Sequence, residues 1–272
     1  MFKKVALGIV FVFAGIGFFL VAGYFAVRFG FTNESGIIDT QREAFFEGIA
    51  PEAIEPSYTG PWEGSEEWLV MEDAIRRDVS VIQRAAADSG VPARLIVANL
   101  VAEQLRLFFT EREAYKKFFY PLKILGPQSQ FSWGVMGMKE DTAIQVENNL
   151  KDTTSPYYLG PEYEHLLDFK TDDVKGERFT RMTDQHDHYW SYLYAGLFLK
   201  QIQVQWENAG YPINNRPEIL STLYNIGYRY SVPKENPQVG GAAITLSDGT
   251  RSFGGLAAEF YNSNLLTDLF AQ

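Results

Sequence analysis

The chain has no cysteine among its 272 residues. Disulfide bonds, thiol nucleophiles and thiolate-bound metals are therefore excluded. Basic residues are also scarce, since 24 Lys and Arg stand against 34 Asp and Glu and leave a formal net charge of −10. Binding to nucleic acid needs clustered basic side chains, so no nucleic-acid partner is expected. The acidic balance also argues against a secreted protein that kills bacteria by adhering to anionic envelopes.

Apolar and aromatic residues, by contrast, are abundant. Hydrophobic residues make up 46% of the chain and aromatic residues 15%. This composition supports one sizeable core, in a single domain of ordinary size with additional segments.

A long uncharged run lies near the N-terminus. No charged residue occurs from Val5 to Val27, and a helix of that length spans the roughly 30 Å hydrocarbon core of a bilayer. We expect an uncleaved transmembrane anchor within residues 1–30. A cleaved signal peptide is the alternative, although its apolar region is usually only about 7–15 residues long. Lys3 and Lys4 favour a cytoplasmic N-terminus, which makes this a single-pass protein of the cytoplasmic membrane with an extracytoplasmic domain.

The rest of the chain divides by composition. Residues 31–65 are rich in Gly, Pro, Ser and acidic residues, which is typical of a linker. Residues 66–272 are predicted to form one mainly α domain. In AAITLSDGTRSF, Asp248-Gly249 separates two short alternating runs and predicts one small β-hairpin. The predicted helical segments lie around Glu103 and at 66–90, 142–150, 188–210, 217–228 and 254–270.

The segment around Glu103 is built for burial. No charge occurs from Leu95 to Ala102, so this part reads as a core helix. Pro92 suits its first turn and predicts a start near Val91. Glu103 then emerges beside apolar surface, where a carboxyl group holds its proton more readily than in water. That property is the one a general acid needs near neutral pH.

Further motifs follow this helix. SGVPARLIVANLVAEQ, GVMGMKEDTA and YAGLFLKQI followed by LYNIGY occur in this order between about residues 80 and 230. Together they resemble the catalytic domain of lytic transglycosylases and goose-type lysozymes, which implies an α+β lysozyme-like fold. The family's apolar helix ends in the catalytic Glu, and Glu103 stands at that position.

The other motifs supply the remaining candidate residues. GVMGMKEDTA resembles the family's Gly-Leu-Met-Gln segment, through Gly134 and Met136. LYNIGY resembles its Ala-Tyr-Asn-Ala-Gly motif, through Tyr224 and Asn225. The resemblance implies that these four residues bind substrate.

Two positions depart from the family pattern. Gln104 stands where the family usually has Ser, and Gly137 stands where it has a groove-lining Gln. The interval between Glu103 and Gly134 is also longer than usual and rich in aromatic residues. An aromatic insertion within 104–133 is therefore expected near the cleft.

The resemblance implies cleavage of peptidoglycan glycan strands with a single catalytic Glu and no metal or organic cofactor. Substrate-assisted glycosidases need no second carboxylate, because the sugar's own acetamido group supports the charged centre. The position of a goose-type water-holding Asp is Lys139 here, while Glu140 and Asp141 are expected to begin the helix that continues through Ala143. A 1,6-anhydro product is therefore expected. A hydrolysing muramidase, or an inactive glycan-binding or scaffold protein, remains the alternative.

Structural roles compete with each functional one. Glu103 can be a solvated helix-end charge, Gly134 a turn glycine and Met136 a core residue. Tyr224 and Asn225 stand where an Asn-x-Gly sequence commonly stops a helix, so capping competes with substrate contact.

TDQHDHYW, at 183–190, places Asp184, His186, Asp187 and His188 close together. On a helix, however, His186 and His188 point to different faces, whereas helical zinc sites usually place two His four residues apart. We expect no metal here. The segment is better explained as an N-terminal cap for a helix that begins at Tyr189.

Overall fold

The computed structural model describes residues 18, 37–38, 61–108, 132–184 and 186–271. The predicted anchor, apart from Phe18, most of the predicted linker and most of the aromatic insertion lie outside these residues. Within the described residues, no helix combines the length and apolarity that a membrane crossing requires.

The described part of the chain is mainly helical, as the sequence predicts. Its eight α-helices are α3 (Glu66–Arg77), α4 (Val79–Ser89), α5 (Ala93–Phe108), α7 (Glu140–Lys151), α8 (Val174–Thr183), α9 (Tyr189–Asn208), α10 (Pro217–Ile226) and α11 (Phe253–Asn262). Two short 3-10 helices, η1 (Trp62–Gly64) and η3 (Tyr228–Tyr230), accompany them.

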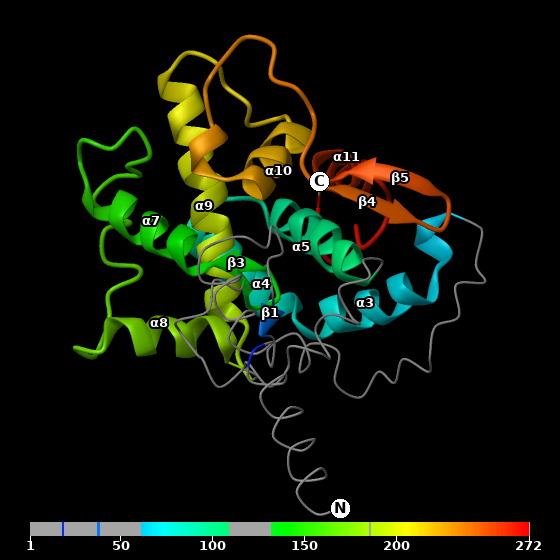
Figure 1. The fold of residues 1–272 in the computed structure, drawn as a ribbon, viewed down its shortest axis with the longest axis horizontal. Coiled ribbons are helices and arrows are strands. Elements are labelled where there is room, and N and C mark those ends of the chain that lie inside the picture. The colour runs from blue at the N-terminus through cyan, green and yellow to red at the C-terminus, as the bar shows by residue number, and fades with distance from the viewer. Residues whose placement is uncertain (1–17, 19–36, 39–60, 109–131, 185, 272) are drawn as a thin grey trace, which may run out of the picture.

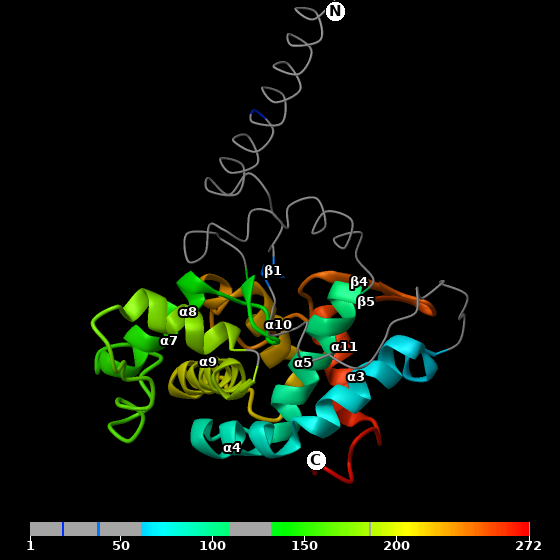
Figure 2. The same cartoon turned by 90° about the horizontal axis from the view of Figure 1, so that it is seen from below.

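The apolar helix α9 organises the fold. It packs against α4, α7, α8 and α10, while α5 packs against α3, α4, α10 and α11. Figure 1 shows α7 and α8 on one side of α9, with α3, α5, α11 and the β4–β5 hairpin on the other. Seen from below in Figure 2, α5 lies between α9 and α3. The helix that carries Glu103 is therefore central.

The predicted helix at 66–90 is two helices. Asp78 ends α3 and begins α4, and its carboxylate accepts hydrogen bonds from His188 and Tyr192, each at 2.6 Å. These bonds connect the junction between α3 and α4 to the N-terminal end of α9. The next helix begins at Ala93 rather than near Val91, because the Pro92 carbonyl accepts the amide hydrogen bonds of Leu95 and Ile96.

The predicted hairpin is present, with a shifted turn. Strands β4 (Ala243–Leu246) and β5 (Gly249–Ser252) pair antiparallel, and Leu246 is opposite Gly249. The connecting residues are therefore Ser247 and Asp248, not Asp248-Gly249 as predicted. Gly249 instead opens β5 with a φ of +137°.

A second small sheet is absent from the sequence prediction. Strands β2 (Ser132–Trp133) and β3 (Met138–Lys139) form an antiparallel pair, and β1 (Ile37–Ile38) joins β2 in parallel. Two-residue strands are too short to produce an alternating pattern, which explains why sequence reasoning missed them. This sheet carries the turn that faces Glu103.

Two further features differ from the sequence reading. Trp62, within the segment assigned to the linker, is fully buried and lies 5.3 Å from the Trp68 ring in an edge-on arrangement. Helix α8 was not predicted, because its sequence VKGERFTRMT is polar. It is held instead by charge: Arg178 donates to both carboxylate oxygens of Glu147 on α7, each at 2.6 Å.

Candidate active site around Glu103

Glu103 lies in the last part of α5, in an otherwise apolar helix. Its residue surface is only 3% exposed. Arg106, one turn further along, donates from Nη2 to Oε1 at 2.5 Å and from Nε to Oε2 at 3.2 Å. The Glu103 side chain is 4% exposed and that of Arg106 is 12% exposed. The carboxylate is therefore buried, with both oxygens held by one guanidinium.

The β2–β3 turn packs directly against this carboxylate. Gly134 and Gly137 have φ angles of +69° and +61°, in the left-handed region that favours glycine. A Cβ atom at Gly137 would lie 2.3 Å from Glu103 Oε1, so no larger residue fits without moving the carboxylate. The neighbouring Gln104 donates to the Val135 carbonyl, which fastens α5 to the same turn.

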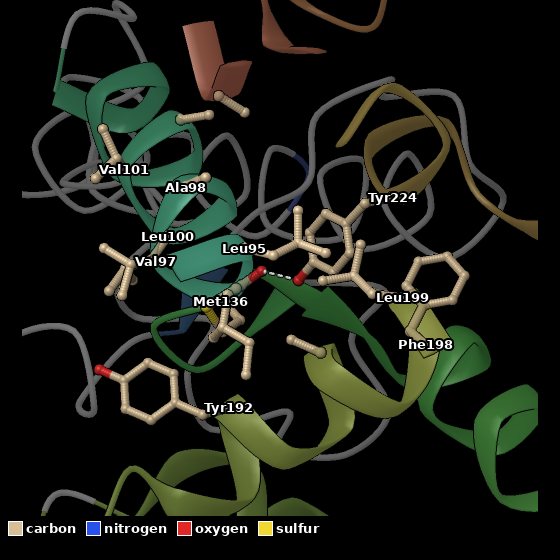
Figure 3. Packing of buried hydrophobic residues seen from close by; sticks show 14 of the residues in the cluster. Leu95, Val97, Ala98, Leu100, Val101, Met136, Tyr192, Phe198, Leu199 and Tyr224 are labelled. Atoms are coloured by element: carbon tan, nitrogen blue, oxygen red, sulfur yellow. Dashed lines mark hydrogen bonds between the residues drawn. The ribbon is translucent and has the colours of Figure 1, made fainter. Parts of the chain in front are cut away.

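Tyr224 reaches the turn from α10. Its hydroxyl donates to the Met136 carbonyl at 2.8 Å, a bond drawn in Figure 3. Burial raises the pKa of Tyr224 well above its ordinary value, and the charge of Glu103 raises it further, while Arg106 opposes the shift. Tyr224 is therefore close enough to Glu103 for the two groups to interact electrostatically, and it donates its hydrogen bond as a neutral phenol.

Most of the predicted site residues thus converge. Glu103, the turn containing Gly134 and Met136, and Tyr224 come together from α5, the β2–β3 turn and α10. The Met136 side chain is fully buried among the core residues of Figure 3, so it is the carbonyl of this residue that contacts Tyr224.

Asn225 has a different set of contacts. Its Oδ1 accepts a hydrogen bond from the Ala242 amide at 2.8 Å, which ties α10 to the segment before β4. The helix itself stops at Gly227, where φ is +91° and the amide donates to the Leu223 carbonyl at 2.8 Å. Asn225 therefore tethers a loop in this structure.

Sequence reasoning did not identify Arg106 and treated Gly137 only as a departure. The spacing of Glu103 and Arg106 was an available signal, since residues three apart share a helix face. The role of Gly137 had no local signal, because it depends on a contact between α5 and a distant turn.

The acidic residues after the turn lie at the start of a helix. Helix α7 begins at Glu140, with Asp141 in its first turn, as predicted. Glu140 Oε1 lies 3.6 Å from Arg178 Nη1, and burial raises the pKa of Glu140. The described contacts of this carboxylate therefore go toward α8.

The His-rich segment leads into a helix at the predicted residue, although the N-cap residue His188 makes no side-chain capping bond. Asp187 Oδ1 accepts from the Tyr189 amide at 3.0 Å, and α9 begins at Tyr189, as predicted. Asp184 Oδ1 accepts from the amides of His186 and Asp187. His188 contacts Asp78 at 2.6 Å. Across the residues that the structure describes, no three His, Asp or Glu side chains are grouped as a metal site would require.

Comparisons with protein-family models, curated proteins and solved structures found no match for this chain.

Proposed function

We propose that this protein is a lytic transglycosylase of lysozyme-like fold, anchored in the cytoplasmic membrane by residues 1–30, with its catalytic domain on the outer side. Its substrate is the glycan strand of peptidoglycan, cut at the β-1,4 bond between N-acetylmuramic acid and N-acetylglucosamine. The motifs around Glu103, Gly134 and Tyr224 supply the substrate class through their resemblance to that family.

One observation carries the proposal. Three of the segments that resemble the family lie far apart in the sequence, yet a residue from each lies around one buried carboxylate. Gly137 touches Glu103, and Tyr224 is bonded to the residue before Gly137. A helix-end charge with only a structural role would not require both contacts.

The chemistry assigns two successive roles to Glu103. As a general acid, it donates a proton to the oxygen of the leaving N-acetylglucosamine, and the bond from that oxygen to C1 of the muramic acid breaks. The same carboxylate then accepts the proton of the C6 hydroxyl as this oxygen bonds to C1. The Glu103 proton is thereby restored, and the product ends in 1,6-anhydro-N-acetylmuramic acid.

The contacts of the nearby acidic residues favour this outcome over hydrolysis. An inverting glycosidase needs a second carboxylate to hold the attacking water. Glu140, the nearest acidic candidate in the sequence, contacts Arg178 on α8, and Lys139 cannot act as a base when charged. A tethered hydroxyl also has a large entropic advantage over free water.

The product separates the candidate functions. Purified sacculi are digested with the full-length protein in detergent, and the released muropeptides are analysed by mass spectrometry. We expect ends of 1,6-anhydro-N-acetylmuramic acid. Reducing ends would instead identify a hydrolysing muramidase.

The first prediction concerns Glu103. In Glu103→Gln the amide keeps the shape of the side chain but cannot supply a proton, so cleavage should fall by at least about 10²–10⁴-fold. The matched control is Glu72→Gln, which breaks an exposed i,i+4 pair with Arg76 on α3 and should leave cleavage unchanged. Near-normal turnover by Glu103→Gln, with an unchanged melting temperature, would remove Glu103 from the mechanism.

A second candidate function has its own support. Because Arg106 contacts both oxygens of the nearly buried Glu103, the described state is that of a closed ion pair. An inactive glycan-binding or scaffold protein could keep that pair permanently. Sacculi that remain intact while the protein co-sediments with them would favour this second function.

A further inference from the structure

Two helices hold the turn beside Glu103 through neighbouring carbonyl groups. The Val135 carbonyl accepts a hydrogen bond from the Gln104 side chain on α5. The next carbonyl, that of Met136, accepts one from the Tyr224 hydroxyl on α10 at 2.8 Å, as Figure 3 shows. The turn is therefore attached to α5 and to α10 at consecutive residues.

Helix α5 contacts the turn at a second point, one residue earlier in the helix. Glu103 lies against Gly137, where an added Cβ would be 2.3 Å from Oε1. Gln104 follows Glu103 and bonds to Val135, on the other side of the turn. The Gly137 amide donates to the Gly134 carbonyl at 3.0 Å and closes the turn. Because the turn is closed, movement at Val135 also moves Gly137 and its contact with Glu103.

The burial of Gln104 limits what its side chain can do. The residue is fully buried, so its amide does not face an approaching substrate. A buried amide is unfavourable unless its polar atoms have partners, and the bond to Val135 supplies one inside the protein. The chain has Gln104 and Gly137 where the family has Ser and Gln. The two departures are complementary, because the longer side chain reaches the turn and the glycine leaves room for the carboxylate.

We propose that Gln104 is a positioning residue for the general acid. By holding Val135, it keeps Gly137 against Glu103 and so fixes the place from which the proton is delivered. This inference rests on the proposed function. Catalysis is sensitive to such placement, since a displacement of about 1 Å can lower a rate about 10²-fold.

Kinetics with soluble glycan strands test this role. In Gln104→Met the side chain keeps its length and its packing but has no N–H donor, so the bond to Val135 is lost. For the full-length protein in detergent, we expect kcat to fall about 10–100-fold while KM stays nearly unchanged, because the residue does not touch the substrate. Release of 1,6-anhydro ends, followed by mass spectrometry, gives both constants.

Two further variants separate positioning from a general loss of folding. Gln104→Asn keeps the amide but is one methylene shorter, so it should also lose kcat. Gln201→Met is the matched control, because Gln201 on α9 is fully buried and donates from Nε2 to the Val146 carbonyl on α7 at 3.0 Å. This control should lower the melting temperature and leave kcat unchanged.

A double-mutant cycle shows whether Gln104 acts through the turn. Tyr224→Phe removes the bond from α10 to the Met136 carbonyl. Once either bond is lost, the turn can move away from Glu103, so the second loss adds little. We therefore expect the fall in kcat of the double variant to be at least about 3-fold smaller than the product of the two single falls, whereas independent residues would give the full product.

The outcomes separate this inference from the proposed function. An unchanged kcat in Gln104→Met, or an equal loss of kcat in Gln201→Met, would overturn the positioning role. If the unaltered protein still cleaves normally, the proposed function stands. A double variant that falls by the full product would also overturn the positioning role. Strands left intact by the unaltered protein would overturn both.

Discussion

At the scale of single residues, the candidate site depends on a glycine where the family pattern has a larger side chain. Gly137 combines a left-handed backbone with direct contact to Glu103. Its conformational freedom allows the turn to form, and its lack of a side chain leaves room for the Glu103 carboxylate.

Replacement of Gly137 tests that role. In Gly137→Ala, the left-handed conformation should cost about 1–2 kcal/mol, and the new methyl group should also displace the Glu103 carboxylate. Gly210→Ala is the matched control, because Gly210 has a φ of +82° but nothing within 4 Å of an added Cβ. We expect similar backbone strain in both variants, and loss of glycan cleavage only in Gly137→Ala. Urea unfolding and muropeptide release measure the two effects, and equal losses in both variants would contradict the contact argument.

Arg94 is the other residue with an exceptional set of contacts. Its fully buried side chain donates five hydrogen bonds to carbonyl groups at and beyond the end of α11. The acceptors are Phe260, Tyr261, Ser263, Leu265 and Phe270, at 2.7–3.3 Å. Burial lowers the pKa of this guanidinium. One side chain thus fixes the C-terminal segment to the first turn of α5.

Loss of these donors should be costly. Arg94→Met would leave several carbonyl groups without partners, and we expect the free energy of unfolding to fall by at least about 3 kcal/mol. Arg84→Met, at an exposed ion pair, should change it by less than about 1 kcal/mol. Urea denaturation of the two variants provides the comparison. A similar small change in both would show that the five bonds contribute little.

At the scale of an element, α7 has an ionisable group with an opposite pKa shift at each end. Burial raises the pKa of Glu140 at its first residue above the ordinary 4.5. Hydrogen bonds from the Thr154 hydroxyl and amide, at 2.6 and 2.9 Å, lower the pKa of Asp152 just beyond its last residue below the ordinary 3.8.

The two ends should therefore respond oppositely to pH. A raised folded-state pKa favours the folded protein below pH 4.5, and this contribution is lost as pH rises through the folded pKa of Glu140. A lowered pKa contributes stability above pH 3.8 that is lost as pH falls through the folded pKa of Asp152. Relative to the unaltered protein, Glu140→Gln should thus have a higher free energy of unfolding at about pH 7 than at about pH 3, and Asp152→Asn a lower one.

Denaturant titrations at both pH values measure these differences. The variants serve as controls for each other, because they lie at opposite ends of the same helix. If Glu140→Gln changes the free energy of unfolding equally at both pH values, the burial argument is contradicted. Burial must make the pKa of Glu140 differ between the folded and unfolded states.

At the scale of the whole molecule, the sequence predicts an anchor in residues 1–30 that lies outside the described residues apart from Phe18. We expect the full-length protein to stay in the membrane fraction after high-salt and alkaline washing, because an apolar span is held by the bilayer core. In spheroplasts, the domain beyond residue 31 should be open to external protease. A shortened protein released into the soluble fraction would show instead that the N-terminal segment is cleaved.

The sequence by itself determined the helices whose patterns are local. The apolar run before Glu103, the contact of Asp187 with the Tyr189 amide and the glycine after α10 all act within a few residues, so their signals are readable without the fold. Polar α8 and the two-residue strands β2 and β3 lacked such patterns. The sequence also supplied Glu103, Gly134, Met136 and Tyr224 as candidates through ordered motifs.

The tertiary structure alone decided what those candidates touch. The contact of Gly137 with Glu103, the bond from Tyr224 to the Met136 carbonyl and the loop contact of Asn225 join segments far apart in the chain. Likewise, burial of Arg178 depends on Glu147 from another helix. Local propensity and periodicity predict whether a segment is a helix or a strand and which of its faces is buried. Contacts between distant segments depend instead on how closely whole helices and strands pack, and there a difference of one methyl group decides whether a site can form.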